Sequence, residues 1–370
     1  MIYKEFQGKK LSALGLGAMR LPVINGEDSC IDEEAVEKMV AYAMKKGINY
    51  FDTAWGYHRG NSEIVMGKVL KKYPRESFYL ADKFPGYDLS NIGRVEEIFE
   101  KQLEKCGVEY FDFYMFHNVC EMNIDEYLNP AYGIFDYLMK QKQNGRIKHL
   151  GFSAHGNMDT MTKFLNAYGK NMEFCQLQIN WLDWEFQSAK EKVALVQSYG
   201  IPVWVMEPLR GGKLVGVDVQ ESFADKSAAE VAFRFIQSLD SVVVTLSGMS
   251  NFEQLAENIK TFETDAPLSE TEGEYLLSLA REMTGKSLPC TACRYCLSKC
   301  PMQLNIPYLI ELYNEDCFSN GGFMAPMALS KLSENKKPSA CLGCAACEAV
   351  CPQSIKIAEA MADFAERLKR

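Results

Sequence analysis

The sequence predicts an α/β protein, a (β/α)8 barrel followed by a small, mainly α-helical domain. Between residue 11 and about residue 262, short β-branched or aromatic runs alternate with longer helical patterns, which is typical of repeated βα units and a parallel sheet. Eight such units occur in about 250 residues, which favours a closed barrel over an open sheet. Nine of the 13 cysteines follow residue 289, and this crowding predicts a separate metal-binding domain.

Each barrel strand is expected where a short β-branched or aromatic run appears. The eight candidates are residues 14–16, 48–53, 78–83, 111–116, 148–153, 174–179, 202–206 and 242–247. Helical patterns between them include residues 33–45, 94–105, 159–167, 190–199 and 228–237. After the first strand, Gly15-Leu16-Gly17-Ala18-Met19-Arg20 lacks the third glycine of a Gly-x-Gly-x-x-Gly motif and any helix behind it. An open dinucleotide-binding sheet is therefore disfavoured.

The predicted domain boundaries follow a change of pattern after residue 262. We expect a barrel over residues 1–262, a linker and helix over 263–288, and the cysteine-rich domain over 289–370. Within the last domain, helices are expected near residues 306–314 and 325–334, with a closing helix over 355–368.

Charge and hydropathy exclude several classes of partner. The net charge is -9 and no lysine- or arginine-rich stripe interrupts the acidic balance, so nucleic acid is not expected as a partner. No basic start followed by an apolar run and no long apolar stretch occurs, so neither a targeting segment nor a membrane span is expected. The expected location is the cytoplasm.

Two cysteine runs share one spacing. They read Cys290-x2-Cys293-x2-Cys296-x3-Cys300-Pro301 and Cys341-x2-Cys344-x2-Cys347-x3-Cys351-Pro352. In bacterial ferredoxins with this spacing, the fourth cysteine of each run binds the cluster of the other run. The spacing therefore predicts two 4Fe-4S clusters, one held by Cys290, Cys293, Cys296 and Cys351 and the other by Cys341, Cys344, Cys347 and Cys300.

Two structural zinc sites are the alternative interpretation of these cysteines. Zinc usually takes its four ligands as two separated pairs, whereas each run here is a quadruplet with a trailing proline. The gap between the runs is long enough for two helices. In this respect the domain resembles the helical dicluster ferredoxins of succinate dehydrogenase-type iron-sulfur subunits.

Four chemically active side chains stand at the ends of three consecutive predicted strands. Asp52 and Tyr57 follow the second strand, Lys83 ends the third and His117 ends the fourth. The active sites of such barrels lie at this end. A carbonyl that receives a hydride needs a proton, which Tyr57 can deliver. Lys83, held by Asp52, is expected to bring the phenol pKa down from about 10, while His117 orients the carbonyl oxygen.

With these four residues, the first 262 residues resemble the aldo/keto reductase family, whose members are TIM barrels. The resemblance implies that Asp52, Tyr57, Lys83 and His117 form the catalytic tetrad and that NADH or NADPH is the cofactor. It also implies a set of nucleotide contacts: Ser153, Gln176, Met206, Leu209, Gly211, Gly248, Gln254 and Asn258. Ala154 stands where the family has an asparagine, and Gln254 where members selective for the 2′-phosphate often have an arginine.

Three functions follow from the two halves together. The leading hypothesis is NAD(P)H-linked reduction of a small carbonyl compound, with clusters that serve a partner such as a ferredoxin or stabilise the architecture. The second is a reductase in which a ferredoxin feeds single electrons through the clusters to the substrate. The third is a non-catalytic electron-transfer module. Because a nicotinamide passes two electrons at once and a cluster passes one, a flavin could join the halves, although no flavin motif is evident.

Overall fold

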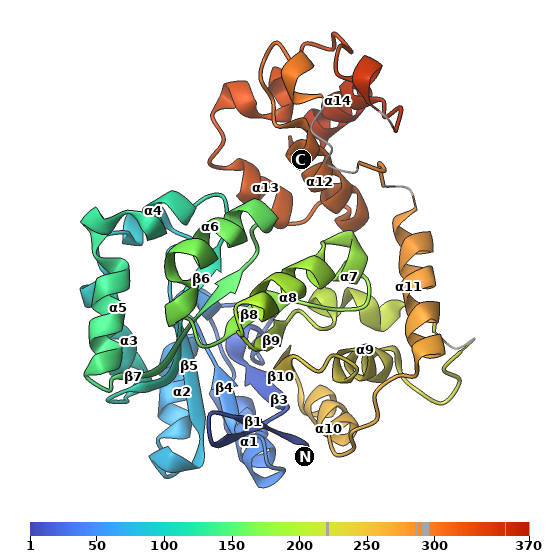
Figure 1. Ribbon diagram of the computed structural model, residues 1–370. Helices are drawn as coiled ribbons and strands as arrows, with labels where there is room; N and C mark the ends of the chain where they lie inside the picture. Colours follow the sequence, from blue (N-terminus) through green and yellow to red (C-terminus); the bar gives the residue numbers. More distant parts are fainter. Residues whose placement is uncertain (220–221, 286, 291–295, 352, 370) are drawn as a thin grey trace. The chain divides into compact units, whose positions relative to one another are not determined.

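The computed structural model of the 370-residue chain describes residues 1–219, 222–285, 287–290, 296–351 and 353–369 (Figure 1). The chain divides into two compact units, Met1–Ala280 and Arg281–Arg370. This division lies inside the stretch that the sequence assigns to the linker and its helix. Among the described residues, none of the helices is both long enough and apolar enough to cross a lipid bilayer.

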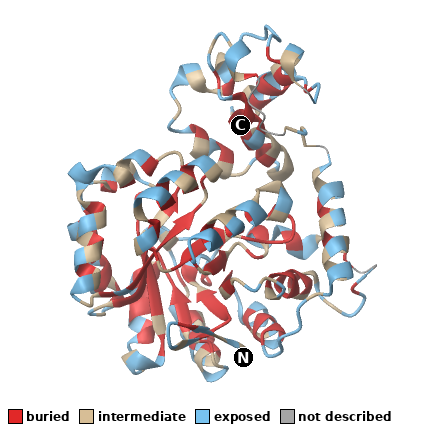
Figure 2. Ribbon diagram, in the orientation of Figure 1, coloured by how far each residue is buried: buried red, intermediate tan, exposed pale blue. Residues whose placement is uncertain are grey.

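Eight parallel strands of the first unit close into a barrel, as the sequence predicts. Their order around the barrel is β10-β3-β4-β5-β6-β7-β8-β9, and Gly248 paired with Gly17 closes the ring. The strands are β3 (Leu14–Gly17), β4 (Tyr50–Asp52), β5 (Tyr79–Phe84), β6 (Phe111–Val119), β7 (Ile147–Ala154), β8 (Cys175–Gln178), β9 (Val203–Met206) and β10 (Val242–Gly248). Most of their residues are buried (Figure 2).

Helices surround the strands on the outside of the barrel (Figure 1). They are α1 (Glu33–Lys45), α2 (Ser62–Leu70), α3 (Val95–Cys106), α4 (Ile124–Leu128), α5 (Ile134–Gln143), α6 (Met158–Tyr168), α7 (Asp183–Phe186), α8 (Ala189–Ser198), α9 (Ala228–Gln237) and α10 (Phe252–Thr261). The next helix, α11 (Glu270–Thr284), contains the division between the two units. Local signals set the ends of the helices. Asp32 caps α1 by accepting the N–H of Ala35, and α3 stops at Gly107, whose φ of 63° is in the left-handed region that glycine tolerates.

An N-terminal hairpin, which the sequence pattern did not predict, packs onto the barrel interior. Its strands β1 (Tyr3–Phe6) and β2 (Lys9–Ser12) are antiparallel. The Phe6 ring meets the rings of Trp204 and His149 edge-on, at centroid distances of 5.1 and 5.0 Å. Phe6 therefore belongs to the same apolar cluster as the side chains that fill the barrel.

The second unit has a small apolar core of its own. Helices α12 (Ile306–Ser319), α13 (Met324–Leu329) and α14 (Ile357–Arg367) contribute most of it. The first of these is longer than expected and ends where Asn320 takes a φ of 50°. By contrast, the helix expected over residues 325–334 ends at Leu329.

Candidate functional site

The four predicted catalytic residues lie at the carboxyl end of the barrel strands. Asp52 is the last residue of β4, Lys83 lies one residue before the end of β5, and His117 lies near the end of β6. Tyr57 opens a short 3-10 turn, Tyr57–Gly60, between β4 and α2. Because the strands are parallel and adjacent, their carboxyl ends share one rim, which brings the four side chains together.

The Lys83 side chain is buried, and its ammonium makes two hydrogen bonds. Its ammonium donates to Asp52 Oδ1 at 2.6 Å and to the Thr53 carbonyl oxygen at 2.7 Å. The same nitrogen lies 5.1 Å from the centroid of the Tyr57 ring. Among the described residues, Asp52 Oδ2 is buried with no hydrogen-bond partner. Asp52 thus holds the Lys83 ammonium near the Tyr57 ring through one carboxylate oxygen, while its other oxygen makes no hydrogen bond among the described residues.

The electrostatics of this cluster partly differ from the sequence prediction. Burial raises the pKa of Asp52, and the charge of Lys83 lowers it in part. Burial likewise raises the pKa of Tyr57, and this effect outweighs the lowering by Lys83, so the net direction is upward. Lys83 does lower this pKa, as expected, but the expectation that the net pKa would fall below its ordinary value is wrong. For Lys83, burial lowers the pKa, but Asp52 and then Tyr57 raise it above its usual value.

His117 faces two phenol rings. Its ring is edge-on to Tyr57 at 6.2 Å and to Tyr87 at 5.0 Å between centroids. Burial, followed by the charge of Lys83, holds the pKa of His117 well below its usual range, so the imidazole is neutral. Its Nδ1 atom is buried and has no hydrogen-bond partner within the described part of the chain. A neutral imidazole has one donor and one acceptor nitrogen, so the ring can form a hydrogen bond with a polar ligand.

Ser153 and Gln176, the predicted carboxamide contacts, are paired neighbours on β7 and β8. Both are buried. Ser153 Oγ accepts the N–H of Asn118 at 2.8 Å, which leaves its own hydrogen available to a ligand. Gln176 Oε1 is buried without a partner among the described residues. Since buried carbonyl oxygens are normally hydrogen-bonded, this atom suits a ligand that brings an N–H donor, as the carboxamide of a nicotinamide does.

The remaining predicted nucleotide residues lie at the ends of β9 and β10, in the segment after β9 and on α10. Met206 ends β9 and Gly248 ends β10, whereas Leu209 and Gly211 belong to the segment between β9 and α9. Gly211 has a φ of 66°, which glycine adopts without strain. The other two, Gln254 and Asn258, lie on α10. Gln254 Oε1 accepts the N–H of Ser250 at 2.8 Å, and Asn258 Nδ2 donates to Ser247 Oγ at 3.1 Å.

Sequence reasoning missed two groups of buried polar residues in the barrel unit. Arg210 and Asp183 form a buried ion pair at 3.0 Å that joins the loops after β8 and β9. Behind Lys83, Glu63, Asp82 and Gln102 form a fully buried polar network. No spacing in the sequence connects these partners, because each contact joins distant parts of the chain. The sequence signal that could have revealed them is a polar residue at a position where the helix or strand pattern expects an apolar, buried one.

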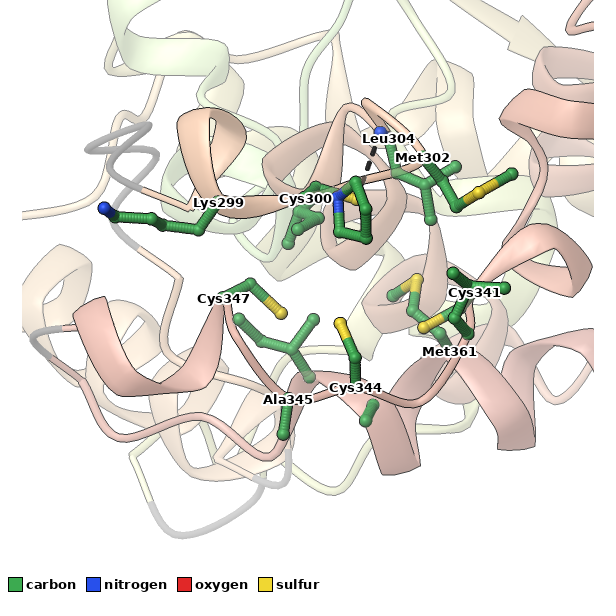
Figure 3. Close-up of a pocket in the computed structure, with 14 residues that line it drawn as sticks. Lys299, Cys300, Met302, Leu304, Cys341, Cys344, Ala345, Cys347 and Met361 are labelled. Atoms are coloured by element: carbon green, nitrogen blue, oxygen red, sulfur yellow. Dashed lines mark hydrogen bonds between the residues drawn. The ribbon is translucent and has the colours of Figure 1, made fainter.

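In the second unit, four cysteines line one pocket (Figure 3). Cys300 comes from the first run, and Cys341, Cys344 and Cys347 come from the second. The backbone N–H of Leu304 donates to the Cys300 sulfur at 3.4 Å. Within the described residues, no three Cys, His, Asp or Glu side chains are arranged to hold a single metal ion. The pocket gathers the same four thiols that the spacing assigns to one cluster.

The other predicted set is described in part. Cys296 is buried, and Cys290 and Cys351 pack partly buried against the apolar core of the unit. Cys293, the fourth member of this set, and Pro352, which ends the second run, lie outside the described residues.

Two family matches cover most of the chain. Residues 13–226 match the aldo/keto reductase family, and residues 289–355 match the 4Fe-4S dicluster domain. The two matches fall in the two units of the structure.

Individual relatives resemble the barrel part. A probable aldo-keto reductase 1 of Glycine max is 30% identical over 238 residues, covering 62% of this chain and 65% of that protein. An NADH-specific methylglyoxal reductase of Escherichia coli is 29% identical over 226 residues, covering 56% and 66%. The chain thus spans just under two thirds of the length of both relatives.

Solved structures share the barrel fold. The holo form of an aldo-keto reductase from Bacillus halodurans superposes with a TM-score of 0.63 at 23% identity, over 75% of this chain and 96% of that one. An aldo-keto reductase from Klebsiella pneumoniae in complex with NADPH gives a TM-score of 0.62 at 17% identity, over 76% and 96%.

Proposed function

Because the chain belongs to the aldo/keto reductase family and carries a 4Fe-4S dicluster domain, we propose that it reduces a small carbonyl compound with NADH or NADPH, with Tyr57 as the proton donor. The observation that carries this proposal is the fixed ammonium of Lys83, bonded to Asp52 and lying under the Tyr57 ring. A substrate carbonyl oxygen that lies next to the Tyr57 phenol and gains negative charge would have a proton donor and the Lys83 cation close by.

Each side chain has a role that suits its surroundings. The raised pKa of Tyr57 keeps the phenol protonated, which is the state that a donor to a carbonyl oxygen needs. Lys83 makes proton release from this phenol easier, because its charge stabilises the phenolate that remains. The neutral ring of His117 orients the carbonyl oxygen. When bound, NADH or NADPH supplies the hydride.

The proposed nucleotide-binding residues belong to the later strands of the same barrel and to the segments that follow them. The unpartnered Gln176 Oε1 would accept from the carboxamide, and the Ser153 hydroxyl would donate to it. Met206, Leu209, Gly211, Gly248, Gln254 and Asn258 complete the proposed set. The E. coli relative is named as NADH-specific, whereas the Klebsiella structure holds NADPH, so both nucleotides belong in the assay.

For the second unit we propose two 4Fe-4S clusters. The pocket lined by Cys300, Cys341, Cys344 and Cys347 supports the first, and its thiols are the ligands that such a cluster takes. Cys290, Cys293, Cys296 and Cys351 would hold the second. When bound, the clusters supply single electrons. The proposed domain boundaries remain residues 1–262 for the barrel and 289–370 for the cluster domain.

The test is anaerobic turnover of a panel of aldehydes and ketones with each nucleotide. Tyr57→Phe removes the donor and keeps the ring, so we expect kcat to fall by about 10²- to 10⁴-fold. Tyr3→Phe, in the exposed N-terminal hairpin and bonded to the Gly47 carbonyl before the start of β4, is the matched control and should retain the wild-type rate. Unchanged turnover in Tyr57→Phe would contradict the proposed function with Tyr57 as the proton donor, whereas no turnover of any carbonyl compound by the wild type would favour a non-catalytic electron-transfer module.

A ferredoxin-fed reductase is the second candidate, and the pocket of four thiols is the observation that favours it. Turnover with reduced ferredoxin and no nucleotide would support this candidate. Turnover on NADH or NADPH alone, with cluster absorbance unchanged during the reaction, would exclude it.

A further inference from the structure

We propose that Glu63, Asp82 and Gln102 are positioning residues that hold the backbone of Lys83 from outside the barrel, an inference that rests on the proposed function. None of the three lies in the mouth. Asp82 precedes Lys83 on β5, and consecutive strand residues point to opposite sides of the sheet. Asp82 therefore faces the helices, while the Lys83 side chain faces the interior.

Hydrogen bonds hold both polar groups of the Lys83 backbone. Its N–H donates to Asp82 Oδ1 at 2.8 Å, and its carbonyl oxygen accepts from Gln102 Nε2 at 3.0 Å. The same Gln102 nitrogen lies 2.9 Å from Asp82 Oδ1 and 3.0 Å from Glu63 Oε1, so its two hydrogens are shared among three acceptor oxygens. Tyr114 in turn donates to Gln102 Oε1 at 2.5 Å, which fixes the orientation of the amide. The backbone of the proposed catalytic lysine is thus held independently of its ammonium.

Glu63 connects this network to the segment that carries Tyr57. It is the second residue of α2, which begins shortly after the Tyr57 turn, and its Oε1 accepts from Gln102 Nε2 at 3.0 Å. Lys105 pairs with its other oxygen. The network therefore joins the two chain segments whose separation sets the distance from the Lys83 ammonium to the Tyr57 phenol.

The charge balance of the network indicates which substitutions it tolerates. Glu63 has the ammonium of Lys105 as its counterion. Burial, followed by repulsion from Glu63, raises the pKa of Asp82 well above its ordinary value. A neutral Asp82 can serve the network, because what Lys83 and Gln102 require from it is an acceptor oxygen. Asparagine keeps that acceptor and alanine removes it.

The experiment compares Asp82→Ala, Gln102→Ala and Asp82→Asn with the wild type in the carbonyl-reduction assay. We expect the two alanine variants to lower kcat by about 10- to 100-fold, because small misplacements of a catalytic group cost about that much. Their Kd for NAD(P)H should stay within about twofold, and the alkaline limb of their pH profile should move to higher pH, since a displaced Lys83 lowers the Tyr57 pKa less. Asp82→Asn should retain most of the wild-type rate.

Lys101→Ala is the matched control, because this residue neighbours Gln102 on α3 but lies at the surface. Two results would overturn the inference: alanine variants with wild-type kcat and pH profile, or a loss of rate that follows the folded fraction with an unshifted pH profile. If one alanine variant fails to fold, the other carries the same test. Failure of the proposed function is a separate result, because it appears as full activity in Tyr57→Phe.

Discussion

Replacing Lys83 by methionine should expose the cost of the buried pair that it forms with Asp52. Methionine has a similar length and no charge, so the change leaves an unpaired carboxylate in a fully buried site. Removing one partner of a buried ion pair costs about 3–5 kcal/mol of unfolding free energy. The upper half of this range is expected here, because Asp52 Oδ2 already has no partner among the described residues and Oδ1 would lose its own.

The pH dependence of this loss has a defined sign. Burial raises the pKa of Asp52 above its ordinary value of 3.8, and removal of Lys83 takes away the charge that lowers it. In the variant, the folded protein therefore holds a proton on Asp52 more tightly than the unfolded chain does. The stability this group contributes is present below pH 3.8 and is lost as the pH rises through the folded-state pKa. The deficit relative to the wild type should be larger at pH 8 than at pH 5.

Denaturation in urea, followed by tryptophan fluorescence, measures this effect in the barrel. All four tryptophans lie in the first unit, so the signal does not report on the cysteine-rich unit. Lys83→Met with Asp52→Asn should recover most of the lost stability, since the second change removes the unpaired charge. Lys101→Met, which breaks an exposed pair, should cost less than about 0.5 kcal/mol. A loss in Lys83→Met below about 1 kcal/mol, or no recovery in the double variant, would refute this reasoning.

Two further predictions concern the cofactors. Cys344→Ser should lower the iron content of the anaerobically purified protein by about half, because one of the two proposed clusters loses a ligand. Cys30→Ser, outside both runs, should leave the iron content unchanged. Equal iron content in both variants would contradict the assignment. Gln176→Leu should raise the unfolding free energy of the nucleotide-free protein by about 1 kcal/mol, since an unpartnered buried oxygen is removed, and should weaken NAD(P)H binding by about tenfold. Urea denaturation measures the unfolding free energy, and calorimetry measures NAD(P)H binding. Unchanged binding in the variant would argue against the carboxamide contact.

The barrel strands were predictable because parallel, doubly covered strands are short continuous apolar runs. The sequence pattern predicts strand 242–247, for example, and the structure has Val242–Gly248. Helix 228–237 coincides with its prediction, since Ser227 caps its start and its apolar face is regular. The N-terminal hairpin was missed because its two strands have only four residues each and show no regular alternation of apolar and polar residues. In the second unit, the helix that ends at Leu329 is shorter than its apolar pattern suggests.

The candidate site was predictable as far as residue type and strand position determine it. Asp52, Lys83 and His117 could be placed at one rim because parallel strands end on the same side. The direction of the Tyr57 pKa could not, because it depends on how strongly burial outweighs one charge, and burial of the phenol depends on the packed structure. The contacts of Gln102 were also beyond sequence reasoning, since its four partners, Glu63, Asp82, Lys83 and Tyr114, come from a different helix and two strands.

Cys300 lines one pocket with Cys341, Cys344 and Cys347, and this arrangement affects when a cluster can be inserted during synthesis of the protein. The barrel sequence emerges first and can fold while the rest is still being made. When the first cysteine run emerges, Cys351, the fourth proposed ligand of its cluster, has not yet been synthesised. Cys300 has likewise emerged before Cys341, Cys344 and Cys347, the other three ligands of the cluster to which it is assigned. Under this assignment, one cluster lacks a ligand until Cys347 has left the exit tunnel and the other until Cys351 has left it, so iron loading must follow the synthesis of both cysteine runs.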